Sequence, residues 1–190
     1  KMKQKAAIVR GWNSKMYLSK TTLAEVFWWK NKIEQNKPIR ATLQQPRAIL
    51  TTDASQYSWG ATLKININKQ EIWFQGDWNN HWRLTSSNQR ETVAVLCGLL
   101  RSAPFLRELQ VQSLKIETDN SSTAYNLNRG AAAISLLKLT DRILEVAEDL
   151  ELQMHAFHIH GKENTIPDSL SRLATSGDYS LKEEILQEVL

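Results

Sequence analysis

The alternation of apolar and polar positions divides the chain into a helical N-terminal segment and a body of mixed elements. Residues 20–36 repeat apolar side chains at helical spacing, with Thr21 or Thr22 as the expected N-cap and Lys37-Pro38 as the end. The runs of β-branched and alternating residues that follow predict three strands, over 47–55, 57–67 and 70–78. Short polar turns separate these runs, so we expect an antiparallel meander.

Helices and strands alternate in the second half of the body. An apolar helix is predicted over 86–103, with Pro104 as its end. It is followed by a strand (111–119), a short helix (120–130), an amphipathic helix (131–150), a strand (152–160) and a helix that begins at Pro167. The order βββαβααβα predicts an α/β fold with a five-stranded mixed sheet flanked by helices.

The charge of the chain is divided unevenly between its ends. The net charge is +4, yet residues 1–40 carry ten Lys and Arg against two acids, and residues 41–190 carry fourteen against eighteen. We therefore expect three parts: a basic helical arm (1–40) that connects to an upstream domain, the body (41–176) and a tail with a short helix (177–190). A basic arm on an acidic body favours contact with a polyanion, although a solvated basic helix has the same composition.

Composition limits the class of protein. A chain of 190 residues, 42% hydrophobic and 23% charged, is sufficient for one globular domain and some additional chain. It has no apolar run of membrane-spanning length and no signal-peptide pattern, so we expect an intracellular protein of the cytoplasm or nucleus, without a membrane partner. The single cysteine, Cys97, is expected to be a buried helix residue. The chain begins "KMKQK" without an initiator Met, so we expect a piece of a longer protein.

Four acids stand at the ends of predicted elements. Asp53 ends the first strand, Glu91 lies in the first turn of the apolar helix, Asp119 ends the fourth strand, and Asp168 begins the last helix. Strand ends and helix starts of an α/β sheet can meet at one edge, where carboxylates repel one another unless cations neutralise them. Such oxygen ligands favour Mg²⁺ or Mn²⁺, and two ions suit phosphoryl transfer. Taken singly, each acid also fits an ordinary turn or helix-start residue.

Four sequence blocks accompany these acids: "TDAS…WGATL", "NQRETVAVL", "ETDNSSTAYNLN" and "HIHGKENTIPDSLSR". In this order they resemble the ribonuclease H domains of retroelement reverse transcriptases. The stretch "TDNSSTAYNLNRG" and the flanks "LSKTTLAEVFWWKNKIEQNKPI" and "SGDYSL" are most similar to DIRS-type (tyrosine-recombinase) retrotransposons, and gypsy-type elements are the next nearest. The resemblance covers roughly residues 20–182.

The resemblance implies a metal-dependent endonuclease. The family's metal-binding and catalytic tetrad falls on Asp53, Glu91, Asp119 and Asp168, which would bind two Mg²⁺ ions, with Mn²⁺ as the alternative. It implies hydrolysis of the RNA strand of an RNA/DNA hybrid during reverse transcription, leaving 5′-phosphate and 3′-hydroxyl ends. It also implies a polymerase domain in the same polyprotein as partner.

Further residues gain candidate roles from the family pattern. His158 matches a catalytic histidine that assists product release in the family. The alternation around it also fits a strand histidine held by packing or by a backbone hydrogen bond, and His160 fits that alternative as well. A zinc site formed by His155, His158 and His160 is disfavoured, because the chain has one Cys and adjacent strand residues lie on opposite faces. Contacts to nucleic acid are expected from Asn88, Gln89 and Asn120. The tryptophans Trp59, Trp73, Trp78 and Trp82 fit core positions better than stacking on bases.

Two departures from the family pattern bear on activity. Pro167 replaces the usual Ala before the last acid, which a helix start tolerates, and "RGAAAIS" replaces a Gly-Gly pair before a Ser. All four acids are present, which favours an active enzyme. The alternatives are a catalytically silent module of the same fold that binds nucleic acid or a polymerase domain, and a nuclease of this fold that acts on DNA.

Overall fold

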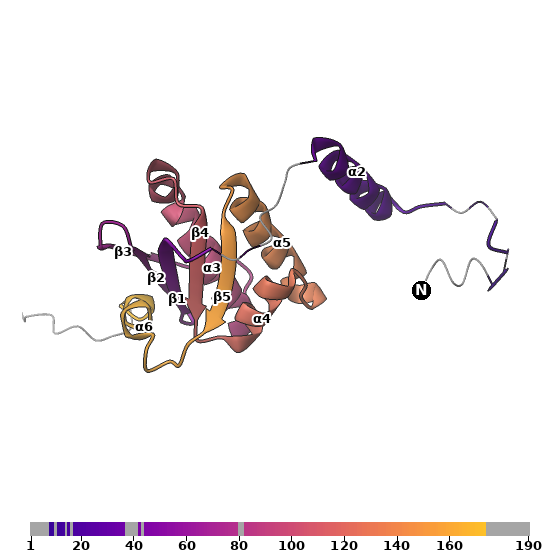
Figure 1. The fold of residues 1–190 in the computed structure, drawn as a ribbon. Helices are drawn as coiled ribbons and strands as arrows, with labels where there is room; N and C mark the ends of the chain where they lie inside the picture. The colour runs from indigo at the N-terminus through magenta and orange to yellow at the C-terminus, as the bar shows by residue number, and fades with distance from the viewer. Residues whose placement is uncertain are drawn as a thin grey trace, which may run out of the picture. The chain divides into compact units, whose positions relative to one another are not determined.

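The structure, a computed structural model, describes residues 8, 9, 11–13, 15, 17–36, 42, 44–79 and 82–173 (Figure 1). The chain divides into two units, residues 1–42 and residues 43–190. The helix predicted within the tail lies outside the described residues, and the proposed limits of arm, body and tail stay predictions. No helix of the described ranges combines the length and the apolar character that crossing a bilayer requires.

The N-terminal unit contains helix α2 (Lys20–Gln35), as the periodicity predicts. The expected cap at Thr21 or Thr22 is wrong: Ser19 is the N-cap, because its extended backbone lets its Oγ accept from the backbone N–H of Thr22 at 3.2 Å. The helix ends where Asn36 takes the left-handed conformation, with φ 42°. None of its residues is buried within the structure.

The second unit is built on one five-stranded sheet in the order β3-β2-β1-β4-β5. The strands are β1 (Ala48–Ala54), β2 (Ser58–Ile65), β3 (Gln70–Asp77), β4 (Ser113–Thr118) and β5 (Gln153–His158). Strands β1, β2 and β3 pair antiparallel, whereas β4 is parallel to both β1 and β5. The predicted meander and mixed sheet are therefore confirmed.

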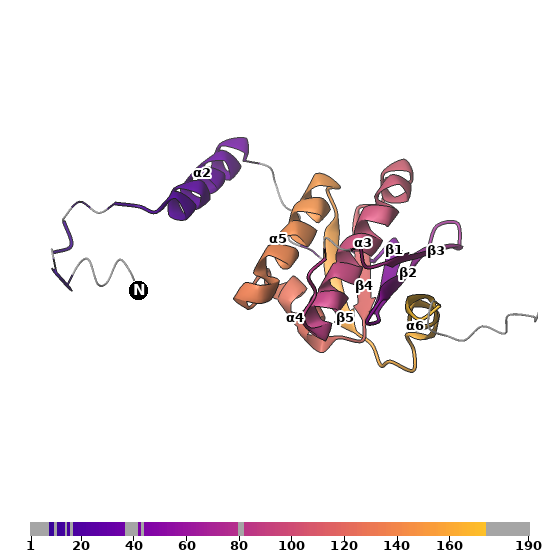
Figure 2. The same ribbon diagram turned by 180° about the vertical axis from the view of Figure 1, so that it is seen from behind.

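The described part of this unit also contains four helices: α3 (Ser87–Glu108), α4 (Ser121–Arg129), α5 (Ile134–Asp149) and α6 (Thr165–Ser171). Figures 1 and 2, seen from opposite sides, show α3, α4 and α5 along one face of the sheet and α6 beside the β1–β2 end. The element order is the predicted βββαβααβα. The sequence placed the start of α5 a few residues too early and the start of α6 two residues too late.

Helix α3 does not end at Pro104, contrary to the prediction; it continues to Glu108. A proline inside a helix removes one backbone hydrogen bond, which favours an end at that point. Here the last turn still packs on the core, because Leu106 is buried and Phe105 lies against Phe74 with ring centroids 6.1 Å apart. Tertiary packing therefore outweighs the lost hydrogen bond.

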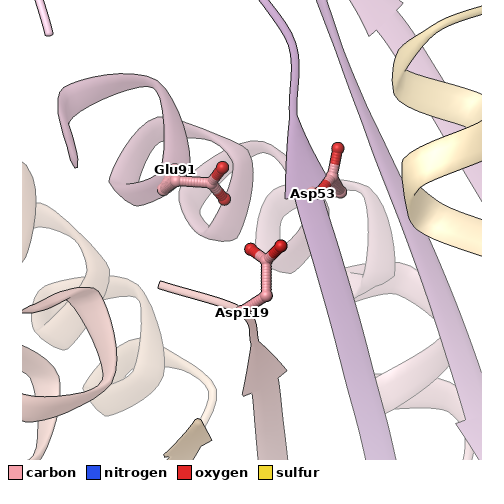
Figure 3. A group of neighbouring side chains, drawn as sticks. All are labelled: Asp53, Glu91 and Asp119. Atoms are coloured by element: carbon pink, nitrogen blue, oxygen red, sulfur yellow. The ribbon is translucent and has the colours of Figure 1, made fainter. Parts of the chain in front are cut away.

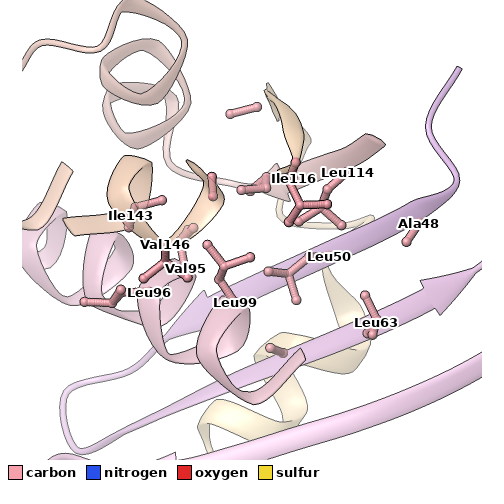
Figure 4. Packing of buried hydrophobic residues seen from close by; sticks show 14 of the residues in the cluster. Ala48, Leu50, Leu63, Val95, Leu96, Leu99, Leu114, Ile116, Ile143 and Val146 are labelled. Carbon is pink, nitrogen blue, oxygen red and sulfur yellow. The ribbon is translucent and has the colours of Figure 1, made fainter. Parts of the chain in front are cut away.

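The hydrophobic core lies between the sheet and the three helices on its inner face (Figure 4). Leu50, Leu63 and Leu99 are fully buried there. Gly98 brings α3 close to the sheet, since a Cβ at this position would lie 3.3 Å from Leu50 Cδ1 and 3.2 Å from Ala61 Cβ. At about 25 cal/mol per Å² of apolar surface, this burial is the main stabilising contribution to the fold.

The opposite face of the sheet receives α6, and Gly60 makes the contact possible. A Cβ on Gly60 would stand 2.3 Å from the backbone oxygen of Pro167 and 2.6 Å from Leu170 Cβ, distances that no side chain tolerates. Gly60 lies opposite Asp53 in the β1–β2 register, so α6 packs directly over the end of β1.

Most of the four tryptophans named in the body occupy core positions, as the sequence favoured. Trp59 is buried, and Trp78 and Trp82 pack against the core from its margin. Trp73 differs, since 59% of its surface is exposed and its indole N–H donates to Glu71 at 3.1 Å. Three of the four side chains therefore belong to the folded interior.

Candidate metal centre and active site

Three of the four predicted acids meet at the carboxyl edge of the sheet. Asp53 lies near the end of β1, Asp119 follows the last residue of β4, and Glu91 comes from the second turn of α3 (Figure 3). Their carboxylates offer oxygen atoms that all lie within 4.8 Å of one another. The parallel pairing of β1 and β4 explains the meeting, because it brings both strand ends to the same edge beside the start of α3.

Burial makes this group of three, hereafter the acidic cluster, electrostatically costly. Only 4% of Asp53 and 7% of Glu91 is exposed. Burial, and then the charges of Asp53 and Asp119, raise the pKa of Glu91 to about 9. Burial also raises the pKa of Asp53, against the opposing effect of a hydrogen bond from Ser171. Without a cation, Glu91 therefore holds a proton at neutral pH.

The donor set fits a divalent cation. Glu91 Oε2 is buried and has no hydrogen-bond partner within the ranges that the structure describes. A buried carboxylate oxygen without a donor is costly, and a metal ion satisfies it directly. Carboxylate oxygens are the ligands that Mg²⁺ and Mn²⁺ prefer. The acidic cluster is thus suited to hold such an ion, and which ion it takes stays a prediction.

Asp168, the fourth predicted ligand, lies outside the acidic cluster. Its Oδ1 pairs with Arg172 Nε at 2.6 Å, one helical turn further along α6. Its charge is nevertheless close enough to raise the pKa of Asp53. The side chain is 41% exposed. Its role as a metal ligand stays a prediction.

His158 is the last residue of β5 and lies at the same edge. Its Nε2 donates to the backbone carbonyl of Asp119 at 3.1 Å. This is the backbone-bound strand histidine that the sequence left as one alternative, and a part in product release stays a prediction. His160 lies beyond the strand, with its ring centroid 6.0 Å from that of His158. With His155 they form no metal-ligand group within the described ranges.

The three residues predicted to contact nucleic acid lie next to the acidic cluster in sequence and are half-buried. Asn120 caps α4 through its Oδ1, and its Nδ2 donates to Asn88 Oδ1 at 2.9 Å. Gln89 accepts from the backbone N–H of Thr85 and donates to the backbone oxygen of Ser135 at 3.4 Å. These bonds join the start of α3 to the end of β4 and the start of α5. Contact with nucleic acid stays a prediction.

Two residues of the site had no assigned role at the level of sequence. Asn164 donates through Nδ2 to Asp53 Oδ1 at 3.2 Å, and Ser171 donates through Oγ to Asp53 Oδ2 at 2.5 Å. Both residues are fully buried. The sequence offered one indication: Ser171 is a small polar residue at a position where an amphipathic helix places its buried face. Nothing in the local pattern, however, identified its acceptor.

Solved structures with a similar fold were found by comparison. The N-terminal RNase H domain of a Mycobacterium tuberculosis protein, solved as a fusion with maltose binding protein, matches with a TM-score of 0.55 and 13% identity. The match covers 77% of this chain and 100% of that one. RNase H1 from the halophilic archaeon Halobacterium salinarum matches at 0.52 and 14%, over 74% and 96% of the two chains. The chain has the ribonuclease H fold.

A viral structure shares this ribonuclease H fold as part of a larger protein. A foamy viral protease-reverse transcriptase in complex with an RNA/DNA hybrid matches at a TM-score of 0.50 and 11% identity. The match covers 86% of this chain and 22% of that one. No family model and no curated protein matches the sequence. At sequence identities of 11–14%, these similarities show a shared fold and nothing more.

Proposed function

We propose that the chain is a ribonuclease H, an endonuclease that uses divalent cations to cut the RNA strand of an RNA/DNA hybrid. One observation carries the proposal: on a ribonuclease H fold, Asp53, Glu91 and Asp119 bring carboxylate oxygens within 4.8 Å of one another at the carboxyl edge of the sheet. The matched foamy viral structure contains an RNA/DNA hybrid, which supports the choice of substrate.

The residues divide the work by position. Asp53 and Asp119, at the ends of neighbouring parallel strands, would share the ions, and Glu91 would complete one shell through its buried Oε2. Asp168 would complete the other shell after leaving Arg172, since its charge is close enough to Asp53 to raise the pKa of that residue. When bound, two such cations supply an activated water and stabilise the leaving 3′ oxygen. His158 would assist departure of the product.

Substrate contact would come from the residues around the start of α3. Asn88, Gln89 and Asn120 are amide side chains, which can donate to bases and sugars in the minor groove. Hybrid duplexes are recognised mainly by shape, phosphates and 2′-hydroxyls, so the proposal predicts little dependence on base sequence. The pair formed by Asn88 and Asn120 would keep these donors at a set distance from the acidic cluster.

The sequence blocks support a narrower proposal about biological context. The residues of these blocks and their flanking segments favour a retrotransposon reverse transcriptase of the DIRS type, with gypsy-type elements next. The domain would act during reverse transcription beside a polymerase domain of the same polyprotein. That context would place the protein in the cytoplasm or nucleus. The alternative is a catalytically silent module of the same fold, for which the separation of Asp168 from the acidic cluster is the observation in favour.

A cleavage assay with defined duplexes tests the proposal. The full chain is incubated with Mg²⁺ or Mn²⁺ and with an RNA/DNA hybrid, duplex DNA or duplex RNA, each labelled at one end. We expect cleavage of the hybrid RNA strand alone, and a loss of roughly 100-fold or more in Asp53→Asn and Asp119→Asn, because each removes a carboxylate that would hold the cations that stabilise the transition state. Asp168→Asn tests whether the fourth acid takes part.

Asp141→Asn, an exposed acid on α5, is the matched control and should cleave like the wild type. Cleavage of duplex DNA would indicate the DNA nuclease instead. Hybrid binding without cleavage in either metal would favour the silent module. Undiminished cleavage by Asp53→Asn would refute the assignment of the site.

A further inference from the structure

The carboxylate of Asp53 is held on both oxygens by buried donors from one segment of the chain. Asn164 Nδ2 lies 3.2 Å from Oδ1, and Ser171 Oγ lies 2.5 Å from Oδ2. Asn164 and Ser171 are both fully buried, and Asp53 is 4% exposed. A carboxylate with a donor on each oxygen cannot rotate about its Cβ–Cγ bond without breaking one of the bonds.

The segment that carries both donors is itself anchored to the sheet. Asn164 Nδ2 also donates to the backbone oxygen of Thr52 at 3.1 Å, which joins the start of α6 to β1. Ser58 Oγ donates to the backbone oxygen of Ser171 at 2.5 Å, which joins the end of α6 to β2. Gly60 leaves the space for this approach. The donors are therefore fixed relative to Asp53 by contacts at both ends of the helix.

We propose that Ser171, together with Asn164, is a positioning residue that orients the Asp53 carboxylate for the divalent cation. The inference rests on the proposed function, since it concerns the same metal site. Each oxygen of a carboxylate has two lone pairs, so one hydrogen bond on each leaves the second lone pair for the ion. Groups that hold a ligating carboxylate in this way typically change metal affinity 10- to 100-fold when they are removed.

Ser171 gives the cleaner test of the two donors. Asn164 has a second bond to the backbone of β1, so its loss would also disturb the fold. Among the residues that the structure describes, the Ser171 hydroxyl has one further hydrogen-bond partner besides Asp53, the Asp168 backbone oxygen within its own helix. Ser169 is a matched control on α6, because it is exposed and its Oγ donates to the backbone oxygen of Thr165 at 2.8 Å.

Titration calorimetry of the metal-free 190-residue chain with MgCl₂ measures the effect directly. We expect Ser171→Ala to weaken Mg²⁺ binding about 10-fold or more, and Ser169→Ala to bind like the wild type. In the hybrid assay, Ser171→Ala should need correspondingly more Mg²⁺ for half-maximal rate, while KM for the hybrid stays unchanged. Excess Mg²⁺ should restore kcat, which it would not do for a variant with a disturbed fold.

Ser171→Cys guards against a folding failure of the alanine variant, because the thiol fills the buried volume but is a weak donor. It should weaken Mg²⁺ binding less than Ser171→Ala does. Wild-type affinity in both variants would overturn the inference while leaving the proposed function intact. If the wild type neither binds Mg²⁺ nor cleaves the hybrid, both the inference and the proposed function fail.

Discussion

Two acids of the acidic cluster are buried nearly as fully as the hydrophobic core, but their burial has the opposite energetic effect. Leu50 and Leu99 are fully buried, and Asp53 and Glu91 expose 4% and 7% of their surface. Burial of the leucines removes apolar surface from water and stabilises the fold. Burial of the carboxylates removes charged groups from water and brings like charges together, which raises the pKa of Glu91 to about 9.

The difference shows which region serves stability and which serves function. A protein selected for stability alone would fill the edge of the sheet with apolar or paired side chains. Instead, the described structure keeps a buried Glu91 oxygen without a hydrogen-bond partner. Sites that bind ligands commonly keep such unfavourable groups at a cost in stability. The predictions on Leu99 and Glu91 that follow separate the two regions.

The largest effect on stability is expected in the core. Leu99→Ala should lower the free energy of unfolding by about 2–5 kcal/mol, since it leaves a cavity among fully buried side chains. The neighbouring Leu100, 47% exposed, provides the control, and Leu100→Ala should cost much less. Urea unfolding measures both variants. Equal losses would contradict the packing of α3, and folded Leu99→Ala should still cleave hybrid.

The acidic cluster should respond in the opposite direction. Glu91→Gln keeps the shape of the side chain and removes a group that must take up a proton when the metal-free protein folds at pH 8, so it should raise the melting temperature at that pH. It should also lower hybrid cleavage roughly 100-fold or more. Glu145→Gln, which loses only an exposed pair with Arg142, should change neither quantity much. A destabilised Glu91→Gln would contradict the repulsion inferred for the site.

The pH dependence of stability follows from the same group. Because the pKa of Glu91 is raised from 4.5 to about 9 on folding, the folded state binds more protons than the unfolded state between these values. Stability of the metal-free protein should therefore fall as pH rises from about 5 to 9, by at most about 1.4 kcal/mol per pH unit for this group. Thermal melts of wild type and Glu91→Gln measure the difference.

Added Mg²⁺ should reduce this pH-dependent loss in the wild type, because a bound cation takes the place of the proton. It should have less effect in Glu91→Gln, which lacks one of the ligands. A wild-type melting temperature that stays level, or rises, across this pH range would indicate that Glu91 is already ionised in the metal-free protein.

The smallest effect is expected from the basic arm. Removing residues 1–40, which carry ten Lys and Arg against two acids, should weaken hybrid binding and reduce its dependence on salt. Hybrid affinity measured over a series of salt concentrations tests this, with the melting temperature of the body as the check on folding. Unchanged binding would favour docking of the arm on a polymerase domain.

Much of the fold was predictable because it depends on local patterns. The β-branched runs around Asp53, the turn residues between them and the apolar period of α3 determine the order of elements from neighbouring residues alone. Local rules failed where a distant contact decided the outcome. Helix α3 passes through Pro104 because Leu106 and Phe105 pack on the core.

The site was predictable in its members more than in its arrangement. The sequence identified Asp53, Glu91 and Asp119, which the structure brings together, and also Asp168, which the structure pairs with Arg172. A pattern of acids at element ends does not specify where each side chain points. The Asp168 side chain points toward Arg172, four residues further along the chain, with which it forms an ion pair.

The sequence by itself determined the kinds of element, their order and the four acids, because periodicity and residue chemistry act over a few neighbouring positions. The tertiary structure alone decided which carboxylates share one space, how strongly burial raises the pKa of Glu91, and which donors hold Asp53. Ser171 is 118 positions from Asp53 in the chain, yet its hydroxyl donates to that carboxylate. Desolvation and hydrogen bonding depend on distances through space, and only the packing of α6 on the sheet sets those distances.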